Sequence, residues 1–404
     1  MANKKDKKPT SPIYFDYSAS TPIDPLVLKS MIPFFQKTYA NTMSLHSLGQ
    51  EAKEHLEKIR DSFAKFLKVS SGEIIFTGSA TETNNFVIKG IAFANQNHGR
   101  HIIVSSIEHP CVLNSAKWLE KKGFQVSYLS VDKNGVVDLD ELQSLITDET
   151  ILISIMHVNN EMGSIQPVEK IGKIISKEKE RRQAKNIEAP IYFHTDASQS
   201  FGKIELNIGK IKCDLLTISS HKIYGPKGAS LMYAKKGTKI TPLIHGGGHE
   251  FGFRSGTVNV PILAGFCKAG ELAIKKQQSD FKKAQKIKAK IIKAIQSKIP
   301  NCHINGTIDT QSPFIISVRF DHIEGESLIY LLDTKNICAS SASACASLAL
   351  QPSHVLLAMG LKPEQAHSTV RLSFGRFTND SDVQHLIKVL PETIDKLRSI
   401  SVFK

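Results

Sequence analysis

The sequence predicts an α/β protein built around a mostly parallel sheet. From Glu73 to about Tyr233, short β-branched runs alternate with stretches of helical periodicity. This alternation is typical of parallel sheets that helices cover on both faces. The expected strands are Glu73–Phe76, His101–Val104, Gln125–Leu129, Ile151–Met156, Ile191–Phe193, Asp214–Ile218 and Ser230–Tyr233. The expected helices in this region are Thr81–Phe93, Pro110–Lys121 and Val168–Lys177.

A long amphipathic helix is expected from about Pro261 to Ser297. One face carries Phe281, Ala284, Ile287, Ile291 and Ile295 at helical spacing. The lysines fall mostly on the other face, which predicts that they are solvated. The remaining residues, Ser312 to Lys404, have the pattern of a smaller α/β domain.

Composition places the chain among ordinary globular enzymes. The 404 residues are 41% hydrophobic and 22% charged, and no apolar run reaches the length of a membrane span. The polar, lysine-rich start, Met1–Thr10, lacks the apolar core of a secretory signal and is expected to be disordered. We therefore expect a cytoplasmic protein that does not bind a membrane.

The net charge of +14 has two interpretations. It fits a surface that binds nucleic acid or another polyanion, and it equally fits a generally lysine-rich surface. The lysines are spread along the chain without a nucleic-acid-binding motif, which favours the second interpretation. None of the six cysteines forms a Cys-x-x-Cys pair, so no metal site is expected. Five of them are interpreted as small hydrophobic residues.

Lys222 lies in the most specific segment, Ser219–Gly228, which directly follows an expected strand. A lysine held in a stiff Gly/Pro turn at a strand end is placed to react with an aldehyde, if neighbouring cations such as His221 and Lys227 lower its pKa. A surface lysine in a turn is the alternative, and for a single lysine it is the commoner one.

Asp196 stands at the end of another segment that begins as an apolar strand, Tyr192-Phe193-His194-Thr195-Asp196. A carboxylate at a strand's carboxyl end can pair with a protonated pyridine nitrogen. It can also simply cap the next helix.

Three further segments follow strands. Gly78–Thr83 begins a helix, where free N–H groups and the Thr81 hydroxyl suit a phosphate, although a plain N-cap has the same pattern. His109 can stack on a cofactor ring and move a proton, or be a hydrogen-bonded structural histidine. Asn160 can orient polar ligand groups, or make ordinary loop hydrogen bonds.

Cys345 lies in the run Ala339–Ser347, which consists almost entirely of alanine and serine. With little side chain to pack, this run is expected to be an exposed loop, and exposure suits a nucleophilic thiol. A helix face of small residues is the alternative.

Together these segments resemble the cysteine desulfurases of the NifS/IscS type, which belong to the class V aminotransferase family of fold type I pyridoxal-phosphate (PLP) enzymes. The resemblance extends from Tyr14–Pro22 to Arg371–Thr378. Its most specific motifs are His157–Glu161, Ser219–Gly228 and His245–Glu250.

The resemblance implies a role for each matching residue. Lys222 would form the Schiff base with PLP, Cys345 would carry the persulfide, and His109 would stack on the ring and act in catalysis. The other implied cofactor contacts are Ala80, Thr81, Asn160, Asp196, Gln199, Ser219, His221 and Thr257. Asn160 and Arg371 would hold the substrate carboxylate.

The resemblance also implies an organisation. Residues 24–270 would form a large PLP-binding domain, and residues 271–404 a small domain joined by the segment 1–23. Thr257 would reach the phosphate of a neighbouring subunit, which implies a homodimer. The implied activity converts L-cysteine to L-alanine and supplies sulfur to an iron–sulfur scaffold or another acceptor, such as the machinery of tRNA thiolation.

Two other functions stay open at this point. One is a different PLP reaction on the same fold, such as that of a selenocysteine lyase or an aminotransferase. The other is a basic RNA-binding or scaffold-binding protein with no cofactor.

Overall fold

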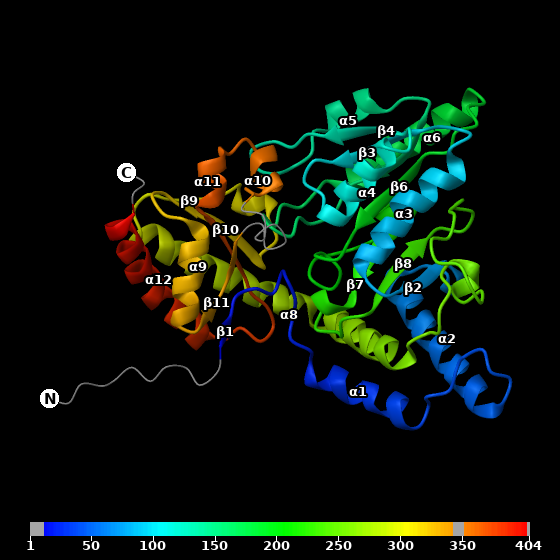
Figure 1. The fold of residues 1–404 in the computed structure, drawn as a ribbon, viewed down its shortest axis with the longest axis horizontal. Coiled ribbons are helices and arrows are strands. Elements are labelled where there is room, and N and C mark those ends of the chain that lie inside the picture. The colour runs from blue at the N-terminus through cyan, green and yellow to red at the C-terminus, as the bar shows by residue number, and fades with distance from the viewer. Residues whose placement is uncertain (1–11, 342–350, 402–404) are drawn as a thin grey trace.

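The computed structural model describes residues 12–341 and 351–401, and these form a large and a small lobe (Figure 1). Cys345 and Met1–Thr10 lie outside the described residues. In the described part of the chain, the large lobe contains a seven-stranded sheet. Its strands, in sheet order, are β2 (Ile74–Thr77), β8 (Ser230–Ala234), β7 (Leu215–Ser219), β6 (Tyr192–Asp196), β5 (Thr150–Ser154), β3 (His101–Ser105) and β4 (Gln125–Leu129).

Of these strands, only β8 runs against its neighbours, β2 and β7. The remaining neighbours pair in parallel, so the carboxyl ends of six strands point to one edge of the sheet. The prediction of a mostly parallel α/β sheet is confirmed, and each expected strand begins and ends within three residues of the observed one.

Helices cover both faces of this sheet because its strands are apolar on both sides. Alternate strand residues belong to different cores: Ile103 packs on one side, and Ile102 and Val104 pack on the other. Helices α3 (Ala80–Asn95) and α4 (Pro110–Glu120) cover one face. The other face is covered by α2 (Ser47–Leu67), α6 (Val168–Ala184), α7 (Ile208–Ile211) and part of α8 (Val260–Lys298). Helix α1 (Pro25–Gln36) packs against α8, and α5 (Leu139–Leu145) packs against β4.

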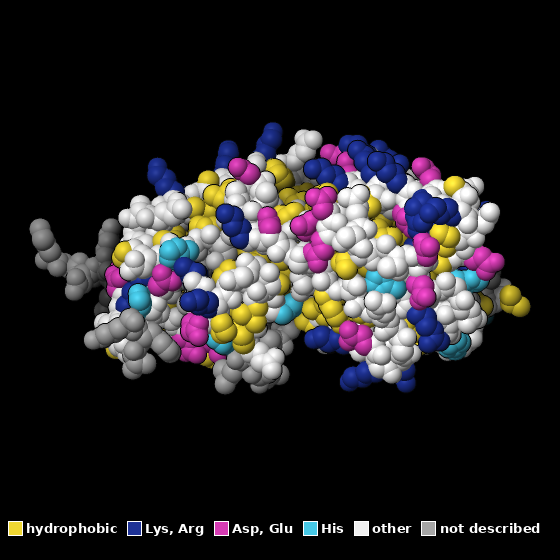
Figure 2. Space-filling view, turned by 90° about the horizontal axis from the view of Figure 1, so that it is seen from above, with side chains coloured by type: hydrophobic (Ala, Val, Ile, Leu, Met, Phe, Trp, Pro, Cys, Tyr) yellow, Lys and Arg dark blue, Asp and Glu magenta, His cyan; other side chains and the backbone are white. Residues whose placement is uncertain are grey.

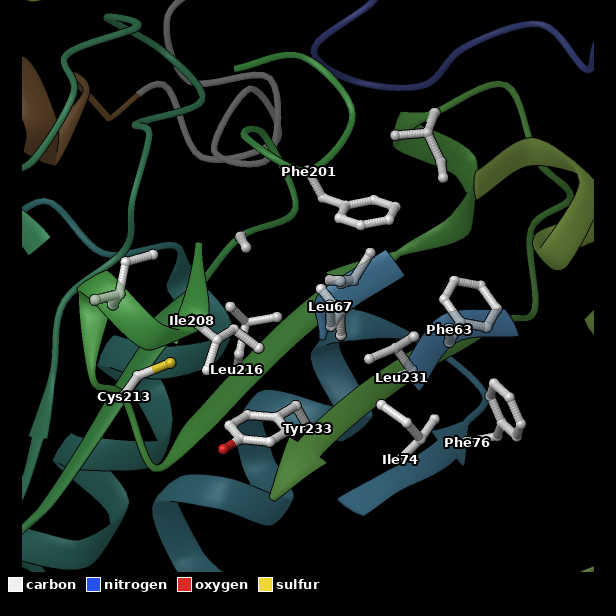
Figure 3. Packing of buried hydrophobic residues seen from close by; sticks show 14 of the residues in the cluster. Phe63, Leu67, Ile74, Phe76, Phe201, Ile208, Cys213, Leu216, Leu231 and Tyr233 are labelled. Atoms are coloured by element: carbon white, nitrogen blue, oxygen red, sulfur yellow. The ribbon is translucent and has the colours of Figure 1, made fainter. Parts of the chain in front are cut away.

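Figure 3 shows the core on the face of the sheet that α2 covers, where Phe63 and Leu67 of α2 lie over β2, β7 and β8. Phe63 stacks edge to face with Phe76 at 5.8 Å between ring centroids. Leu216, Leu231 and other apolar side chains fill the remaining space (Figure 3). This packing holds the strand ends in fixed positions at the sheet edge.

The small lobe is built on an antiparallel sheet that follows α8. The sheet order is β12 (Ser340–Ser341), β13 (Thr369–Ser373), β10 (Ile315–Phe320) and β9 (Cys302–Ile304). Its helices are α9 (Gly325–Thr334), α10 (His354–Ala358), α11 (Pro363–His367) and α12 (Asp380–Ile400). Strand β1 (Ile13–Tyr14) pairs in parallel with β11 (Ile337–Cys338) and so attaches the N-terminal segment to this lobe.

Helix α8 contributes to the cores of both lobes, through Leu263 and Phe266 in one and Ile291 and Ile295 in the other. The domain boundary expected at residue 270 therefore falls inside a continuous helix, and we keep it as a proposal. The apolar face expected for this helix is present. The expectation that the lysines of this helix are solvated is wrong at Lys288. This residue is buried, and its Nζ donates to Gln311 Oε1 and the Ser312 carbonyl.

Basic side chains are distributed over the surface. On the face shown in Figure 2, Lys and Arg are spread along the whole length of the molecule among Asp and Glu. No helix among the described residues is long and apolar enough to cross a membrane.

Candidate active site

The carboxyl ends of the parallel strands open into a cavity of about 400 Å³, which we call the central cavity. Segments that follow β2, β3, β5, β6 and β7 line one side of it. Ser18 and Ala19 of the N-terminal segment and Arg371 of β13 line the other. The structure brings together these expected site residues: Ala80, Thr81, His109, Asn160, Asp196, Gln199, Ser219, His221, Lys222 and Arg371.

Two expected site residues are not among those that line the central cavity. Thr257 is exposed and lines a separate, smaller cavity beside Gly78 and Arg254. Cys345 lies outside the described residues, so its approach to the central cavity stays a prediction.

Lys222 follows β7 through a single 3₁₀ turn, Ser220–Lys222. The turn packs so closely that a Cβ at Gly225 would overlap the Ser220 hydroxyl, and Tyr224 adopts a φ of 68°. The Nζ of Lys222 donates to the carbonyls of Ser18 at 2.6 Å and Ala19 at 2.8 Å. The amine is therefore held at the cavity wall by main-chain acceptors, in a fixed direction.

Asp196 ends β6 with both carboxylate oxygens engaged. Oδ2 accepts from Nδ2 of Asn84 at 2.7 Å, and Oδ1 accepts from the Ser198 amide at 2.8 Å. The side chain is nearly buried. A carboxylate oriented in this way presents a fixed negative charge to a cationic ring atom in the cavity.

His109 is the N-cap of α4. Its Nδ1 accepts the Cys111 amide at 3.2 Å and lies 3.1 Å from the Cys111 thiol sulfur. Because a main-chain N–H only donates, the neutral ring carries its proton on Nε2. Burial lowers the pKa of His109, and Lys222 adds to this, while Asp196 opposes it. Cys111 packs against the core beneath α3 and α4 as the small apolar residue expected, and it also lines the cavity.

Gln199 and His221 contact neighbours that sequence patterns do not reveal, and Nδ1 of His221 lies 3.2 Å from the Ser20 hydroxyl. Gln199 donates from Nε2 to the Ser18 carbonyl and accepts from Nζ of the buried Lys203. Burial lowers the pKa of Lys203 to about 7, with Lys222 adding to the shift. Burial likewise lowers the pKa of His221 to about 4, and neighbouring lysines contribute.

The first turn of α3 borders the cavity through Ser79, Ala80 and Thr81. The first N–H groups of a helix have no acceptors within it, and the helix dipole places partial positive charge there. The Ser79 side chain caps only the Glu82 amide. This turn therefore offers donors to an anionic group in the cavity.

Arg371 is 2% exposed and points two donors at fixed acceptors: Asp16 Oδ1 at 2.7 Å and the Asn160 carbonyl at 3.0 Å. Its Nε has no hydrogen-bond partner among the described residues. A buried guanidinium whose Nε has no protein partner is suited to a carboxylate ligand.

The family model described as aminotransferase class-V matches residues 13–386, nearly the entire chain. The chain belongs to this family. Members of the family are PLP enzymes, and the observed sheet with its small second lobe fits fold type I.

Among curated relatives, cysteine desulfurase IscS 1 of Archaeoglobus fulgidus is 43% identical over 388 residues, covering 96% of this chain and 98% of that protein. Cysteine desulfurase IscS of Rickettsia typhi is 42% identical over 402 residues, covering 99% and 95%. A solved structure of a NifS-like protein matches with a TM-score of 0.87 at 38% identity, covering 96% and 100%. A structure described as SspA in complex with cysteine has a TM-score of 0.78 at 35% identity, covering 89% and 98%.

Sequence reasoning missed several cavity residues of this family member. Asn84 lines the cavity and bonds Asp196 from inside α3, and Lys203, which is not part of the lining, bonds Gln199 from a turn. Neither residue stands in a distinctive motif. Glu161 and His354 also line the cavity. Glu161 ends the motif that begins at His157, so its position next to Asn160 was an available signal. Among the described residues there is no cluster of three or more His, Cys, Asp or Glu side chains that could hold a metal.

Proposed function

We propose that this protein is a PLP-dependent cysteine desulfurase that converts L-cysteine to L-alanine and transfers the sulfur to Cys345 as a persulfide. The observation that carries the proposal is the meeting of Lys222, Asp196 and Arg371 in one cavity. Relatives named cysteine desulfurase at 42–43% identity over nearly the whole chain support the same activity.

The residues of the cavity fit PLP. Lys222 holds the cofactor covalently, and Asp196 pairs with the ring nitrogen. His109 stacks on the ring, and Gln199 donates to its phenolic oxygen. The first turn of α3, with Ala80 and Thr81, binds the phosphate together with Ser219 and His221. The unsatisfied buried hydroxyl of Ser198, which also lines the cavity, is one polar group that a ligand would satisfy.

PLP, when bound, supplies an electron sink for the pair released at the substrate's α-carbon. Arg371 and Asn160 hold the substrate carboxylate, and the ion pair with Asp16 keeps the guanidinium in position. Sulfur transfer then requires a thiolate on Cys345. Its electron pair forms the S–S bond to the substrate sulfur, and the C–S bond breaks with its pair going to carbon, which takes up a proton as alanine forms.

A homodimer is part of the proposal. Large apolar side chains are exposed along α1 and the segment after it, and such patches mark interaction sites. They are Leu28, Ile32, Phe35, Tyr39, Met43 and Leu45. In the homodimer Thr257, which lies outside its own subunit's central cavity, serves the phosphate of the neighbouring subunit.

The sulfur acceptor is proposed as a chain of iron–sulfur assembly or of tRNA thiolation, and the location as the cytoplasm. The basic surface, with its interspersed acidic groups, fits an acceptor protein better than a nucleic acid (Figure 2).

The test is product analysis. Purified protein loaded with PLP and given L-cysteine and a thiol reductant is expected to release alanine and sulfide in equal amounts. Release of neither product contradicts the proposal. Faster turnover of selenocysteine, or transamination of keto acids without sulfide, would assign a different reaction of this family.

A further inference from the structure

His354 is a further imidazole of the central cavity, beside His109 and His221, and the resemblance to known desulfurases assigned it no role. It begins α10 of the small lobe and lines the cavity together with His109, Lys222 and Arg371. Its Nε2 lies 2.9 Å from the main-chain carbonyl of Glu108.

The carbonyl partner determines the tautomer of His354. A carbonyl oxygen only accepts hydrogen bonds, so Nε2 must carry the proton, and Nδ1 of the neutral ring has a lone pair. Within the described residues, Nδ1 has no hydrogen-bond partner. It is therefore available as a proton acceptor to a ligand in the cavity.

In His109 the main chain engages the other ring nitrogen, Nδ1, although the proton is again on Nε2. Its Nδ1 is occupied by the Cys111 amide, so the neutral ring presents Nε2–H, a donor. The imidazoles of His109 and His354 thus differ in polarity, one offering a proton and the other a lone pair. This difference comes from two main-chain hydrogen bonds and does not depend on the positions of ligands.

The surroundings of His354 favour its neutral form. Burial lowers the pKa of His354 and Lys117 adds to this, while the bond to the Glu108 carbonyl opposes it. The other titratable groups around it are His109, the buried Glu108 and Glu161, whose carboxylate accepts a hydrogen bond from the adjacent Ser353.

We propose that Nδ1 of His354 accepts the thiol proton of the substrate cysteine during sulfur transfer and then returns it to the carbon that loses the sulfur. The inference rests on the proposed desulfurase function. The S–H bond breaks with its electron pair staying on sulfur, an N–H bond forms at Nδ1, and the persulfide leaves as an anion. The pair of the broken C–S bond goes to carbon, which takes the proton back from Nδ1–H of His354, so the imidazole ends neutral again. Protons and charges balance without any further reactant.

The decisive variant is His354→Gln. Glutamine can still donate to the Glu108 carbonyl but cannot accept a proton, so it separates a catalytic role from a structural one. A matched control is His385→Gln on α12, where Nε2 also bonds a main-chain carbonyl, that of Lys335, but the residue lies outside the cavity lining. General-base removal is expected to lower kcat/KM for cysteine roughly 100-fold in His354→Gln. His385→Gln is expected to stay within about twofold of the wild type.

Three readouts complete the test. In the wild type, kcat/KM should fall at acid pH as His354 takes up a proton, and this limb should be absent in His354→Gln. Added imidazole should restore part of the activity of His354→Ala. Two-bond ¹H–¹⁵N spectra should assign the Nε2–H tautomer to both His109 and His354. If His354→Gln retains wild-type kcat/KM with an unchanged acid limb while His354→Ala does not, His354 is only an anchor for α10 and the inference is overturned. An inactive wild type would instead contradict the desulfurase function itself.

Discussion

Nδ2 of Asn84 donates a 2.7 Å hydrogen bond to Oδ2 of Asp196, joining α3 to the end of β6 across 112 residues of sequence. With the Ser198 amide on Oδ1, this bond fixes both oxygens of the carboxylate. The orientation of Asp196 toward the cavity is therefore built by a helix on one face of the sheet.

We expect Asn84→Ala to weaken PLP binding about tenfold, because a hydrogen bond to a charged group contributes about 1.5–3 kcal/mol. Titration of the apoprotein with PLP, followed by absorbance, measures the dissociation constant. Asn85→Ala is the matched control, since the Asn85 side chain bonds within its own helix, to the Thr81 carbonyl and to Lys89. Equal affinities of the two variants would show that Asn84 does not support Asp196.

Cys345→Ser is expected to bind PLP and cysteine normally but to form no persulfide, because a hydroxyl cannot form the S–S bond. Alanine and sulfide release should fall at least about 100-fold, and mass spectrometry should detect no added sulfur on the protein. A matched change at Cys338, whose thiol lies outside the cavity lining, is expected to leave both unaffected. Undiminished desulfuration by Cys345→Ser would remove this residue from the reaction.

Glu250→Gln is expected to destabilise the large lobe. Glu250 makes a two-pronged ion pair with Arg60 at 2.8 and 2.9 Å, and both side chains are 2% exposed. Weakening this pair leaves the buried Arg60 charge with Glu57, at 3.2 Å and 44% exposed, as its remaining ion-pair partner, with a cost of about 3 kcal/mol. The midpoint of urea unfolding should fall clearly, whereas Glu205→Gln, in an exposed pair with Lys210, should hardly move it. Similar midpoints for the two variants would contradict this assignment.

The raised pKa of the buried Glu108 carboxyl predicts how the stability of the protein depends on pH. Burial raises its pKa to about 8, from an ordinary value near 4.5, so the folded protein binds its proton more tightly than the unfolded chain does. The resulting stabilisation is complete below the unfolded pKa and is lost as pH rises through about 8. Glu108→Gln mimics the protonated side chain, because Oε1 still accepts from Ser105 and the Met156 amide.

Urea unfolding of both proteins between about pH 5 and 9 tests this relation. The wild type should lose stability across the range more steeply than Glu108→Gln, and at the alkaline end the variant should be the more stable protein. Parallel curves would mean that Glu108 does not titrate in this range.

The sheet and the strand-end motifs were predictable because they depend on local patterns. Consecutive apolar residues in β3 and β5 mark strands buried on both faces, and the parallel arrangement brings the residues after them to one edge. This is why Lys222 and Asp196, which follow different strands, could be expected in one site.

Other features depend on contacts between distant segments. Lys288 stands beside the buried Ile287 in a lysine-rich helix, and only the loop carrying Gln311 makes its burial possible. His354 resembles any capping histidine until the Glu108 carbonyl, 246 residues away, defines its tautomer. The contact of Thr257 with the cofactor phosphate was predicted from family resemblance, and this contact requires a second subunit.

The most direct measurement is the identification of the amine that holds the cofactor. The PLP-loaded protein is reduced with borohydride and digested, and the modified peptide is mapped by mass spectrometry. We predict a pyridoxyl adduct on Lys222 alone, and no adduct after Lys222→Ala. The nearby Lys203 is a demanding internal competitor, because burial lowers its pKa to about 7. An adduct on Lys203 in the wild type, or none on Lys222, would contradict the central claim.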